Sequence, residues 1–278
     1  MSVTGGMNPM IFLLSTSCNM HSAKIFCWSC LAVFLAWSVR AHAADIQIRE
    51  TTQATSQGAV AVKAFFAADQ GRHAAVVILH GSQGLEKFRT FYERNAASLA
   101  RAGFNAYLLS YYNGQDAACA KTVEQRRANF AKRIMAWSLM VSDVVTSILA
   151  DGRNTRAVGL VGYSQGGFLG ADVASRDDRV SALVVFYGGI SPTRSPDKRS
   201  PAHMPPLLEL HGDADATVPM ERGKELVDMT RSLGQSAEMV VYPGAGHGFG
   251  GATAADAEQR TLAFFQAQLT GHDLLPLP

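Results

Sequence analysis

The chain alternates short apolar runs with longer stretches in which apolar residues recur every three to four positions. Short runs rich in branched residues are typical of buried strands, and the longer periodic stretches indicate helices. The predicted strands cover residues 75–79, 104–110, 157–161, 182–187, 207–210 and 237–242. The predicted helices cover residues 88–102, 119–150 (as one or two helices), 165–175, 220–233 and 254–269.

This alternation predicts an α/β fold with a mostly parallel central sheet and helices on both faces. Ligands of open α/β folds bind at the carboxyl edge of the sheet. The irregular segment 188–206 and the residues 111–114 are expected at that edge. They either shape the substrate pockets or serve only as packing and solvent-exposed connections.

The first 43 residues have the pattern of a signal peptide. Lys24 precedes an apolar run from Ile25 to Val39, which at 15 residues is shorter than the roughly 20 needed to span a bilayer. Small residues follow at Ala41 and Ala43, so we expect cleavage after Ala43, with an uncleaved anchor as the alternative. This signal-peptide pattern predicts an exported protein, periplasmic or secreted, without stable membrane association after cleavage. Residues 44–278 would form a single domain, and the true start is Met1 or Met20.

Charge and cysteine content narrow the function classes. The chain has 25 basic and 23 acidic side chains, and loss of the predicted leader removes only Lys24 and Arg40. A near-neutral chain of this kind argues against a nucleic-acid partner. Of the four cysteines only Cys119 lies beyond the leader, so core packing must supply the stability without an intrachain disulfide. The oligomeric state is not indicated.

The sharpest motif is Gly162-Tyr163-Ser164-Gln165-Gly166-Gly167, which follows the predicted strand at 157–161 and opens a helix. A tight strand-to-helix turn of this type lifts a serine hydroxyl out of the sheet, and flanking glycines avoid collisions with neighbouring backbone. Ser164 is therefore the predicted nucleophile. The backbone N–H of Gln165, at the helix N-terminus, is a predicted oxyanion donor.

A serine hydroxyl needs a base, which should be a downstream histidine in a loop after a late strand. His247 fits, because it lies in a glycine-rich loop just after the predicted strand that ends at Tyr242. His80 and His211 also follow strands and precede glycines, but we expect their imidazoles to bond backbone rather than react.

The third member must be a carboxylate that orients the imidazole. Asp213 and Asp215 both follow the strand at 207–210, and the order Ser, Asp, His is that of the α/β-hydrolase fold. We choose Asp215 and expect Asp213 to form a turn. A second oxyanion donor should lie in the loop after the first predicted strand, where the backbone N–H of Ser82 is the candidate and Gln83 the rival.

At these motifs the chain resembles the dienelactone hydrolase family of the α/β hydrolases, over roughly residues 59–269. The resemblance is carried by His80–Leu85, Leu99–Phe104, Gly162–Gly167, His211–Pro219 and Gly246–Phe249. The family pattern His-Gly-x-x-Asp-x-x-Val-Pro implies Asp215 as the acid. The enzymes that gave the family its name use a cysteine nucleophile and a glutamate in the early loop, whereas this chain has Ser164, Gly81 and Ser82. This departure points to serine esterase chemistry instead of dienelactone specificity.

The expected function is hydrolysis of a small-molecule carboxylic ester or lactone through an acyl-enzyme, with no metal and no organic cofactor. Two alternatives remain. The same triad could act on an amide, thioester or peptide, or the scaffold could be a non-catalytic binding protein.

Overall fold

The computed structural model describes residues 45–118, 121–191 and 203–270. The predicted signal peptide and Cys119 lie outside these residues, as do residues 192–202 of the irregular segment. Cleavage after Ala43, export, and the division into a leader and a single domain therefore stay predictions.

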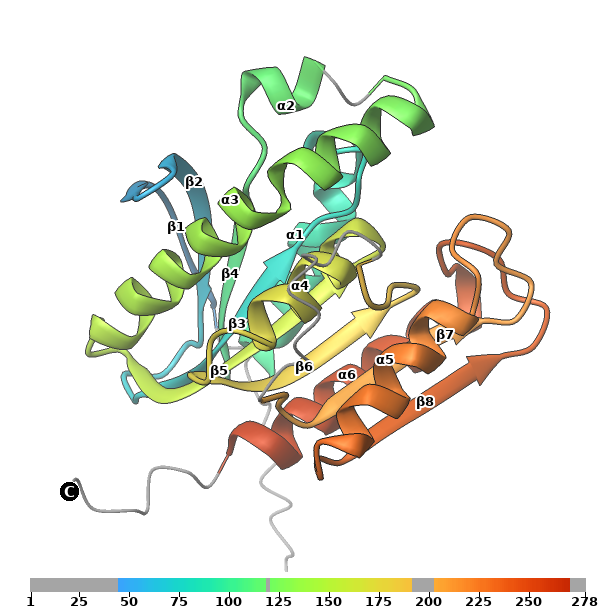
Figure 1. Cartoon of the computed structure of the whole chain (residues 1–278). Helices are drawn as coiled ribbons and strands as arrows, with labels where there is room; N and C mark the ends of the chain where they lie inside the picture. Colours follow the sequence, from blue (N-terminus) through green and yellow to red (C-terminus); the bar gives the residue numbers. More distant parts are fainter. Residues whose placement is uncertain (1–44, 119–120, 192–202, 271–278) are drawn as a thin grey trace, which may run out of the picture. The chain divides into compact units, whose positions relative to one another are not determined.

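Eight strands form one sheet in the order β1-β2-β4-β3-β5-β6-β7-β8 (Figure 1). They are β1 (Gln47–Thr55), β2 (Gly58–Phe66), β3 (His73–Leu79), β4 (Asn105–Ser110), β5 (Asn154–Tyr163), β6 (Val180–Phe186), β7 (Leu207–Gly212) and β8 (Ala237–Tyr242). The pairs β1/β2 and β2/β4 are antiparallel, and the other neighbours are parallel. The predicted mostly parallel sheet is confirmed.

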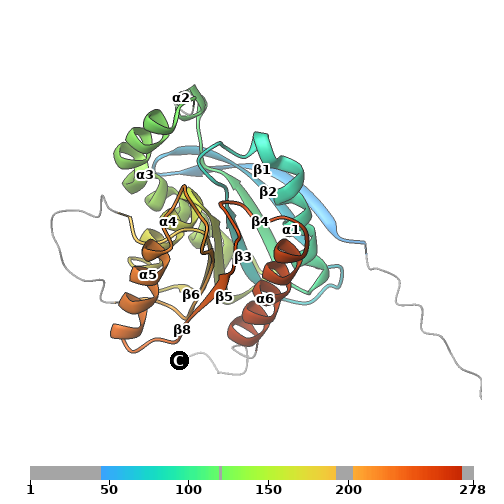
Figure 2. The same ribbon diagram turned by 90° about the vertical axis from the view of Figure 1, so that its right-hand side faces the viewer.

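Helices cover both faces of the sheet (Figure 2). They are α1 (Arg89–Arg101), α2 (Gly114–Ala118), α3 (Val123–Ala150), α4 (Gln165–Ala174), α5 (Glu221–Ser232) and α6 (Gly251–Leu269), with a short 3₁₀ helix at Glu86–Phe88. Helices α3, α4 and α5 pack into one apolar core, and α1 and α6 pack into the other. The inner strands β3 to β7 are thus buried on two sides, which explains their largely apolar sequences, whereas the edge strand β8 has no buried residue.

Helix α3 begins with a capping box formed by Thr122 and Gln125. Thr122 accepts a hydrogen bond from the N–H of Gln125 at 3.2 Å, and the Gln125 side chain accepts one from the N–H of Thr122 at 3.1 Å. By length and composition alone this 28-residue helix could cross a membrane. Its buried face packs against the sheet, however, and core helices of soluble proteins pass the same test.

The hairpin formed by β1 and β2 is not among the predicted strands. Strand β1 is an edge strand, and most of its residues are exposed, so its sequence has little of the apolar pattern that marks the central strands. The hairpin extends the sheet on the antiparallel side. The predicted site lies elsewhere, at the carboxyl ends of the parallel strands.

Candidate active site

Ser164 lies in the turn between β5, which ends at Tyr163, and α4, which begins at Gln165. Its backbone has a φ of 53° and a ψ of −117°, a conformation that residues other than glycine rarely adopt. The N–H of Ser164 donates to the carbonyl oxygen of Phe186 at 2.8 Å, which ties the turn to the end of β6. The serine therefore sits on a strained turn at the carboxyl edge of the sheet.

Two glycines make this turn possible by close approach. A Cβ atom on Gly162 would lie 2.2 Å from the carbonyl oxygen of Gly166. A Cβ atom on Gly166 would lie 2.2 Å from the carbonyl oxygen of Leu79, in β3. Both contacts involve backbone atoms, so neither can be relieved by moving a side chain. The turn accepts no side chain at either position.

The structure brings His247 to Ser164 from the loop between β8 and α6. Its Nε2 atom lies 2.9 Å from the Oγ atom of Ser164, across a sequence separation of 83 residues. Its Nδ1 atom lies 2.7 Å from Oδ2 of Asp215. A carboxylate can only accept, so Nδ1 carries the proton and the lone pair of Nε2 faces the serine hydroxyl.

Asp215 is held for this contact by its own loop. Its carboxylate is completely buried, and Oδ1 accepts hydrogen bonds from the N–H groups of Thr217 and Val218 at 2.8 and 2.9 Å. The other oxygen is thereby aimed at His247. Asp213, the rival carboxylate, instead accepts from the N–H of Gly244 at 2.6 Å and links the loops after β7 and β8.

Ser82 and Gln165 approach the nucleophile from two loops. Ser82 follows β3, and the preceding Gly81 lies beside the turn, since a Cβ atom built on it would be 3.7 Å from Cβ of Ser164. Gln165 is the first residue of α4. Both line the same cavity as Ser164. Gln83, the rival of Ser82, is not among the lining residues.

This cavity has a volume of about 470 Å³ and is open to solvent on one side. Besides Ser82, Ser164 and Gln165, its walls comprise apolar or hydroxyl-bearing residues and three arginines: Val123, Phe130, Phe168, Thr217, Val218, Pro219, Arg126, Arg127 and Arg222. The arginines come from α3 and α5, and no carboxylate lines the cavity. None of residues 111–114 lines this cavity, which favours the second of the two interpretations given for them, packing.

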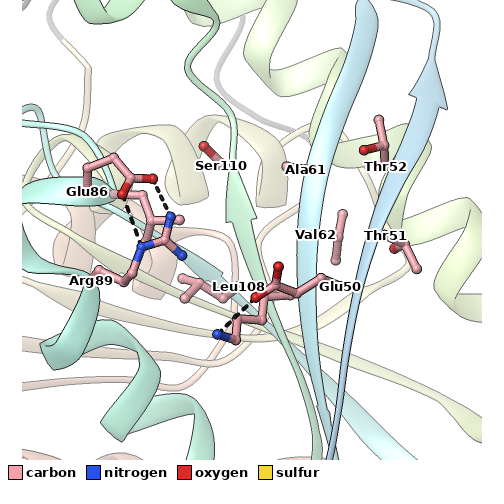
Figure 3. A pocket seen from close by; sticks show the side chains of 11 residues that line it. Glu50, Thr51, Thr52, Ala61, Val62, Glu86, Arg89, Leu108 and Ser110 are labelled. Carbon is pink, nitrogen blue, oxygen red and sulfur yellow. Dashed lines mark hydrogen bonds and ion pairs between the residues drawn. The ribbon is translucent and has the colours of Figure 1, made fainter.

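A second cavity of about 300 Å³ lies between β1, β2, β4 and the start of α1 (Figure 3). Its charged side chains pair with one another. Lys63 binds Glu50 and Glu93 at 3.0 and 2.9 Å, and Arg89 binds Glu86. It shares no lining residue with the cavity at Ser164. These ion pairs connect the hairpin to α1 and leave no group poised for chemistry.

Behind Asp215 lies a buried pair that the sequence reasoning missed. Nδ1 of His211 lies 2.9 Å from Oε1 of Glu209, and Nε2 lies 3.0 Å from the carbonyl oxygen of Val218. Nε2 is also 3.6 Å from Oδ2 of Asp215. Burial lowers the pKa of His211, but the Glu209 carboxylate outweighs it, so the pKa is raised. A glutamate inside the apolar run Leu208–Leu210 was the available signal, because a buried charge requires a partner.

Within the described residues no cluster of three or more histidine, cysteine, aspartate or glutamate side chains could hold a metal ion. Next to the cavity, the hydroxyl of Ser164, the imidazole of His247 and the carboxylate of Asp215 instead form a hydrogen-bonded series. Such a set can pass a proton from an alcohol to a ring nitrogen and back.

The sheet order and the turn at Ser164 define the class of protein, an α/β hydrolase. Residues 62–269 match the model of the Dienelactone hydrolase family, and the chain belongs to that family. The resemblance found in the sequence motifs is thereby confirmed.

Two relatives illustrate the similarity. A Yersinia pestis protein provisionally named carboxymethylenebutenolidase is 25% identical over 197 residues, which are 65% of this chain and 73% of that protein. A rice protein named "Probable inactive carboxylesterase" is 34% identical over 102 residues, or 36% of this chain. That match spans only 42% of the rice protein.

Solved structures share the fold at low identity. A dienelactone hydrolase-like promiscuous phosphotriesterase from metagenomic libraries has a TM-score of 0.68 at 16% identity, covering 80% of this chain and 98% of that one. The Pyrococcus horikoshii acylaminoacyl peptidase has a TM-score of 0.65 at 13% identity, covering 81% of this chain and 42% of the peptidase. These similarities establish the fold alone, and the chain is a hydrolase by family.

Proposed function

We propose that the chain hydrolyses carboxylic esters or lactones of small molecules through an acyl-enzyme formed on Ser164. The observation that carries this proposal is the unbroken hydrogen-bonded series from Ser164 to His247, at 2.9 Å, and from His247 to Asp215, at 2.7 Å. Three residues from three separate loops meet in the geometry that activates an alcohol as a nucleophile.

In the proposed first step, Oγ of Ser164 attacks the ester carbonyl carbon while Nε2 of His247 takes the hydroxyl proton. Asp215 stabilises the resulting imidazolium through its contact with Nδ1. The imidazolium then protonates the leaving alkoxide, and the C–O bond to it breaks. In the second step, water gives a proton to the same nitrogen and attacks the acyl carbon. The bond from that carbon to Oγ then breaks as the imidazolium returns its proton to Oγ, which releases the acid and restores Ser164 and His247.

The tetrahedral oxyanion of each step would be held by the backbone N–H groups of Gln165 and Ser82. Gln165 is suited to this role by its place at the N-terminus of α4, where unpaired N–H groups and the helix dipole favour negative charge. Each such donor contributes about 3 kcal/mol to lowering the barrier.

The cavity walls suggest which esters fit. Phe130, Phe168 and Val218 offer apolar contact. The guanidinium groups of Arg126 and Arg127 in α3 favour a negatively charged substituent, whereas that of Arg222 is paired with Glu225 at 3.0 Å. We therefore propose esters or lactones that carry a carboxylate or phosphate on an otherwise apolar body. Matched neutral and anionic substrates of graded chain length would establish this preference.

The central test is Ser164→Ala. We expect kcat/KM on the best ester to fall by roughly 10⁴-fold or more, because no other group replaces the nucleophile. A fluorophosphonate should label the wild-type protein on Ser164, as read by intact mass and peptide mapping, and should leave the variant unlabelled. Ser110→Ala, which removes a hydroxyl from the other cavity, is the matched control and should retain activity.

The outcomes separate the alternatives. Full activity of the Ser164→Ala variant would refute the nucleophile. A wild-type protein that neither reacts with the fluorophosphonate nor turns over any ester would favour a non-catalytic binding protein. Labelling combined with faster turnover of amides or thioesters than of esters would favour the corresponding hydrolase.

A further inference from the structure

Tyr112 follows β4, and its hydroxyl lies between the two loops that flank Ser164. The side-chain amide of Gln165 donates to Oη of Tyr112 at 2.7 Å. The same hydroxyl donates to the carbonyl oxygen of Ser82 at 3.1 Å. Because an amide N–H only donates and a carbonyl only accepts, the direction of both bonds is fixed. One hydroxyl therefore connects the loop after β3 with the first residue of α4.

The ring that carries this hydroxyl is held from three sides. It stacks on Trp137 of α3 with centroids 5.1 Å apart, and it makes edge contacts with Tyr111 and His80 at 5.2 and 4.9 Å. Trp137 is itself completely buried. Burial raises the pKa of Tyr112 to about 12, so its hydroxyl keeps the proton it donates. The contact is made by a rigid, protonated group.

The loop after β3 is held residue by residue. Tyr111 donates its hydroxyl proton to the carbonyl oxygen of His80 at 2.7 Å. The N–H of Gly81 donates to the hydroxyl of Tyr92 at 2.9 Å. With the bond from Tyr112 to Ser82, three successive residues of this loop are each fixed by a tyrosine hydroxyl. Tyr111 lies 3.4 Å from the Gln165 amide, so Tyr112 makes the shorter link to α4.

These contacts concern the two residues that the proposed function assigns to the oxyanion hole. Two donors from different loops stabilise an oxyanion only when their spacing is preset, because reorganisation during the reaction would cost part of the gain. A bridge between the loops can supply that preset spacing without contacting the substrate. Removing the bridge should therefore lower kcat, which depends on the transition state, and should leave KM nearly unchanged.

We propose that Tyr112 is a positioning residue for the oxyanion hole, its hydroxyl setting the spacing between the loop of Ser82 and the N-terminus of α4. This inference rests on the proposed function. It adds a role for a residue that neither lines the cavity nor belongs to the triad.

The test is Tyr112→Phe, which removes the hydroxyl and keeps the ring stacked on Trp137. We expect kcat on a small ester to fall by about tenfold, the weight of one hydrogen bond, with KM changed by less than about twofold. The rate of inactivation by a fluorophosphonate, whose adduct is tetrahedral, should fall in parallel. An unchanged kcat, or a rise in KM alone, would overturn the role.

A matched control removes a different buried tyrosine hydroxyl. Tyr107 of β4 donates to Oδ1 of Asn154 at 3.0 Å, at the start of β5 and so at the opposite end of that strand from Ser164. Tyr107→Phe should lower the thermal unfolding midpoint at least as much as Tyr112→Phe while leaving kcat unchanged. An equal loss of kcat in both variants would reduce the effect of Tyr112 to general destabilisation and reject the proposal.

A double-mutant cycle tests the bridge itself. Gln165→Met retains the backbone N–H but removes the donor to Tyr112. If the hydroxyl acts through Gln165, the double variant should be little slower than the slower single variant, whereas additive losses would contradict the bridge. Ser164→Ala, measured alongside, separates the two hypotheses. Activity there would refute the proposed function, while loss there with a fully active Tyr112→Phe would refute only the positioning role.

Discussion

Two histidines occupy matching places in the sheet and have opposite electrostatic environments. His80 directly follows β3 and His211 lies at the end of β7, each precedes a glycine, and each is completely buried. Nδ1 of His80 lies 2.9 Å from the carbonyl oxygen of Gly81, and Nε2 finds no partner among the described residues. Burial lowers the pKa of His80 to about 4, so the ring is neutral near pH 7 and stacks on Tyr111 with centroids 3.9 Å apart.

His211 differs because an acid is buried with it. Its ring nitrogens face Oε1 of Glu209 at 2.9 Å and the carbonyl oxygen of Val218 at 3.0 Å, and when Glu209 is ionised only a doubly protonated ring satisfies both. Burial raises the pKa of Glu209 in spite of its contact with His211. The comparison shows that the local sequence, a strand with His-Gly at its end, does not determine whether the histidine ring is charged. The residue two positions earlier decides it, since Glu209 precedes His211 where Ile78 precedes His80.

The largest expected effect comes from removing the cation. His211→Phe should lower the free energy of unfolding by about 3–5 kcal/mol, because it leaves the carboxylate of Glu209 buried without a counter-charge. Urea denaturation followed by far-UV circular dichroism would measure this loss. A change below about 1 kcal/mol would mean that the pair is neutral and that the two histidines are alike.

A smaller effect concerns pH. In the wild-type protein the pKa of His211 is raised, so its stabilising contribution is full below about pH 6.5 and is lost as the pH rises through the folded-state value. In Glu209→Gln the contribution of the carboxylate is gone, while burial still lowers that pKa and the smaller raising contributions of Val218 and Asp215 remain. The pKa of His211 should therefore fall below its wild-type value, and stability should depend less on pH above pH 6.5. The difference in the free energy of unfolding between the wild-type protein and Glu209→Gln should therefore decrease from pH 6 to pH 9, by at most about 1.4 kcal/mol per pH unit.

Denaturation at a series of pH values would follow that gap. Glu238→Gln, which neutralises an exposed glutamate on the neighbouring strand β8, is the matched control and should run parallel to the wild-type protein. A gap that stays constant or widens with pH would show that Glu209 does not hold a proton on His211.

The smallest effect is expected at the neutral histidine. His80→Phe keeps a flat ring against Tyr111 and gives up only the hydrogen bond to Gly81, so the free energy of unfolding should change by no more than about 1 kcal/mol. The measurement is the same denaturation experiment. A loss as large as that of His211→Phe would indicate that His80 also carries a buried charge.

Much of the fold and of the proposed triad could be predicted because the signals are local. The parallel strands are continuous apolar runs, and Ser164 and His247 stand in glycine-rich motifs beside them. The structure extends the strand predicted at 157–161 to Asn154–Tyr163 and begins the helix predicted within 119–150 at Val123. It also adds a short helix, α2, that was not predicted. Such shifts at the ends of elements reflect fraying and capping, which periodicity does not encode.

The remaining features depend on contacts between distant residues. Hairpin β1–β2 is stabilised by pairing with β4 rather than by its own pattern. Glu209 could be suspected from its place in an apolar strand, but its partner could not be named without knowing which side chains face it. The bridge from Tyr112 to Gln165 spans 53 residues, and nothing in either local sequence indicates it.

The glycines at 162 and 166 have a consequence for anyone who diversifies this hydrolase in the laboratory. In a random library that varies either position, most variants cannot form the turn, because a Cβ atom at residue 162 or 166 would lie 2.2 Å from a backbone carbonyl oxygen. Four lining residues from α3 and α5 lie away from this turn and outside the apolar cores, and they are the positions at which specificity can be varied: Val123, Arg126, Arg127 and Arg222.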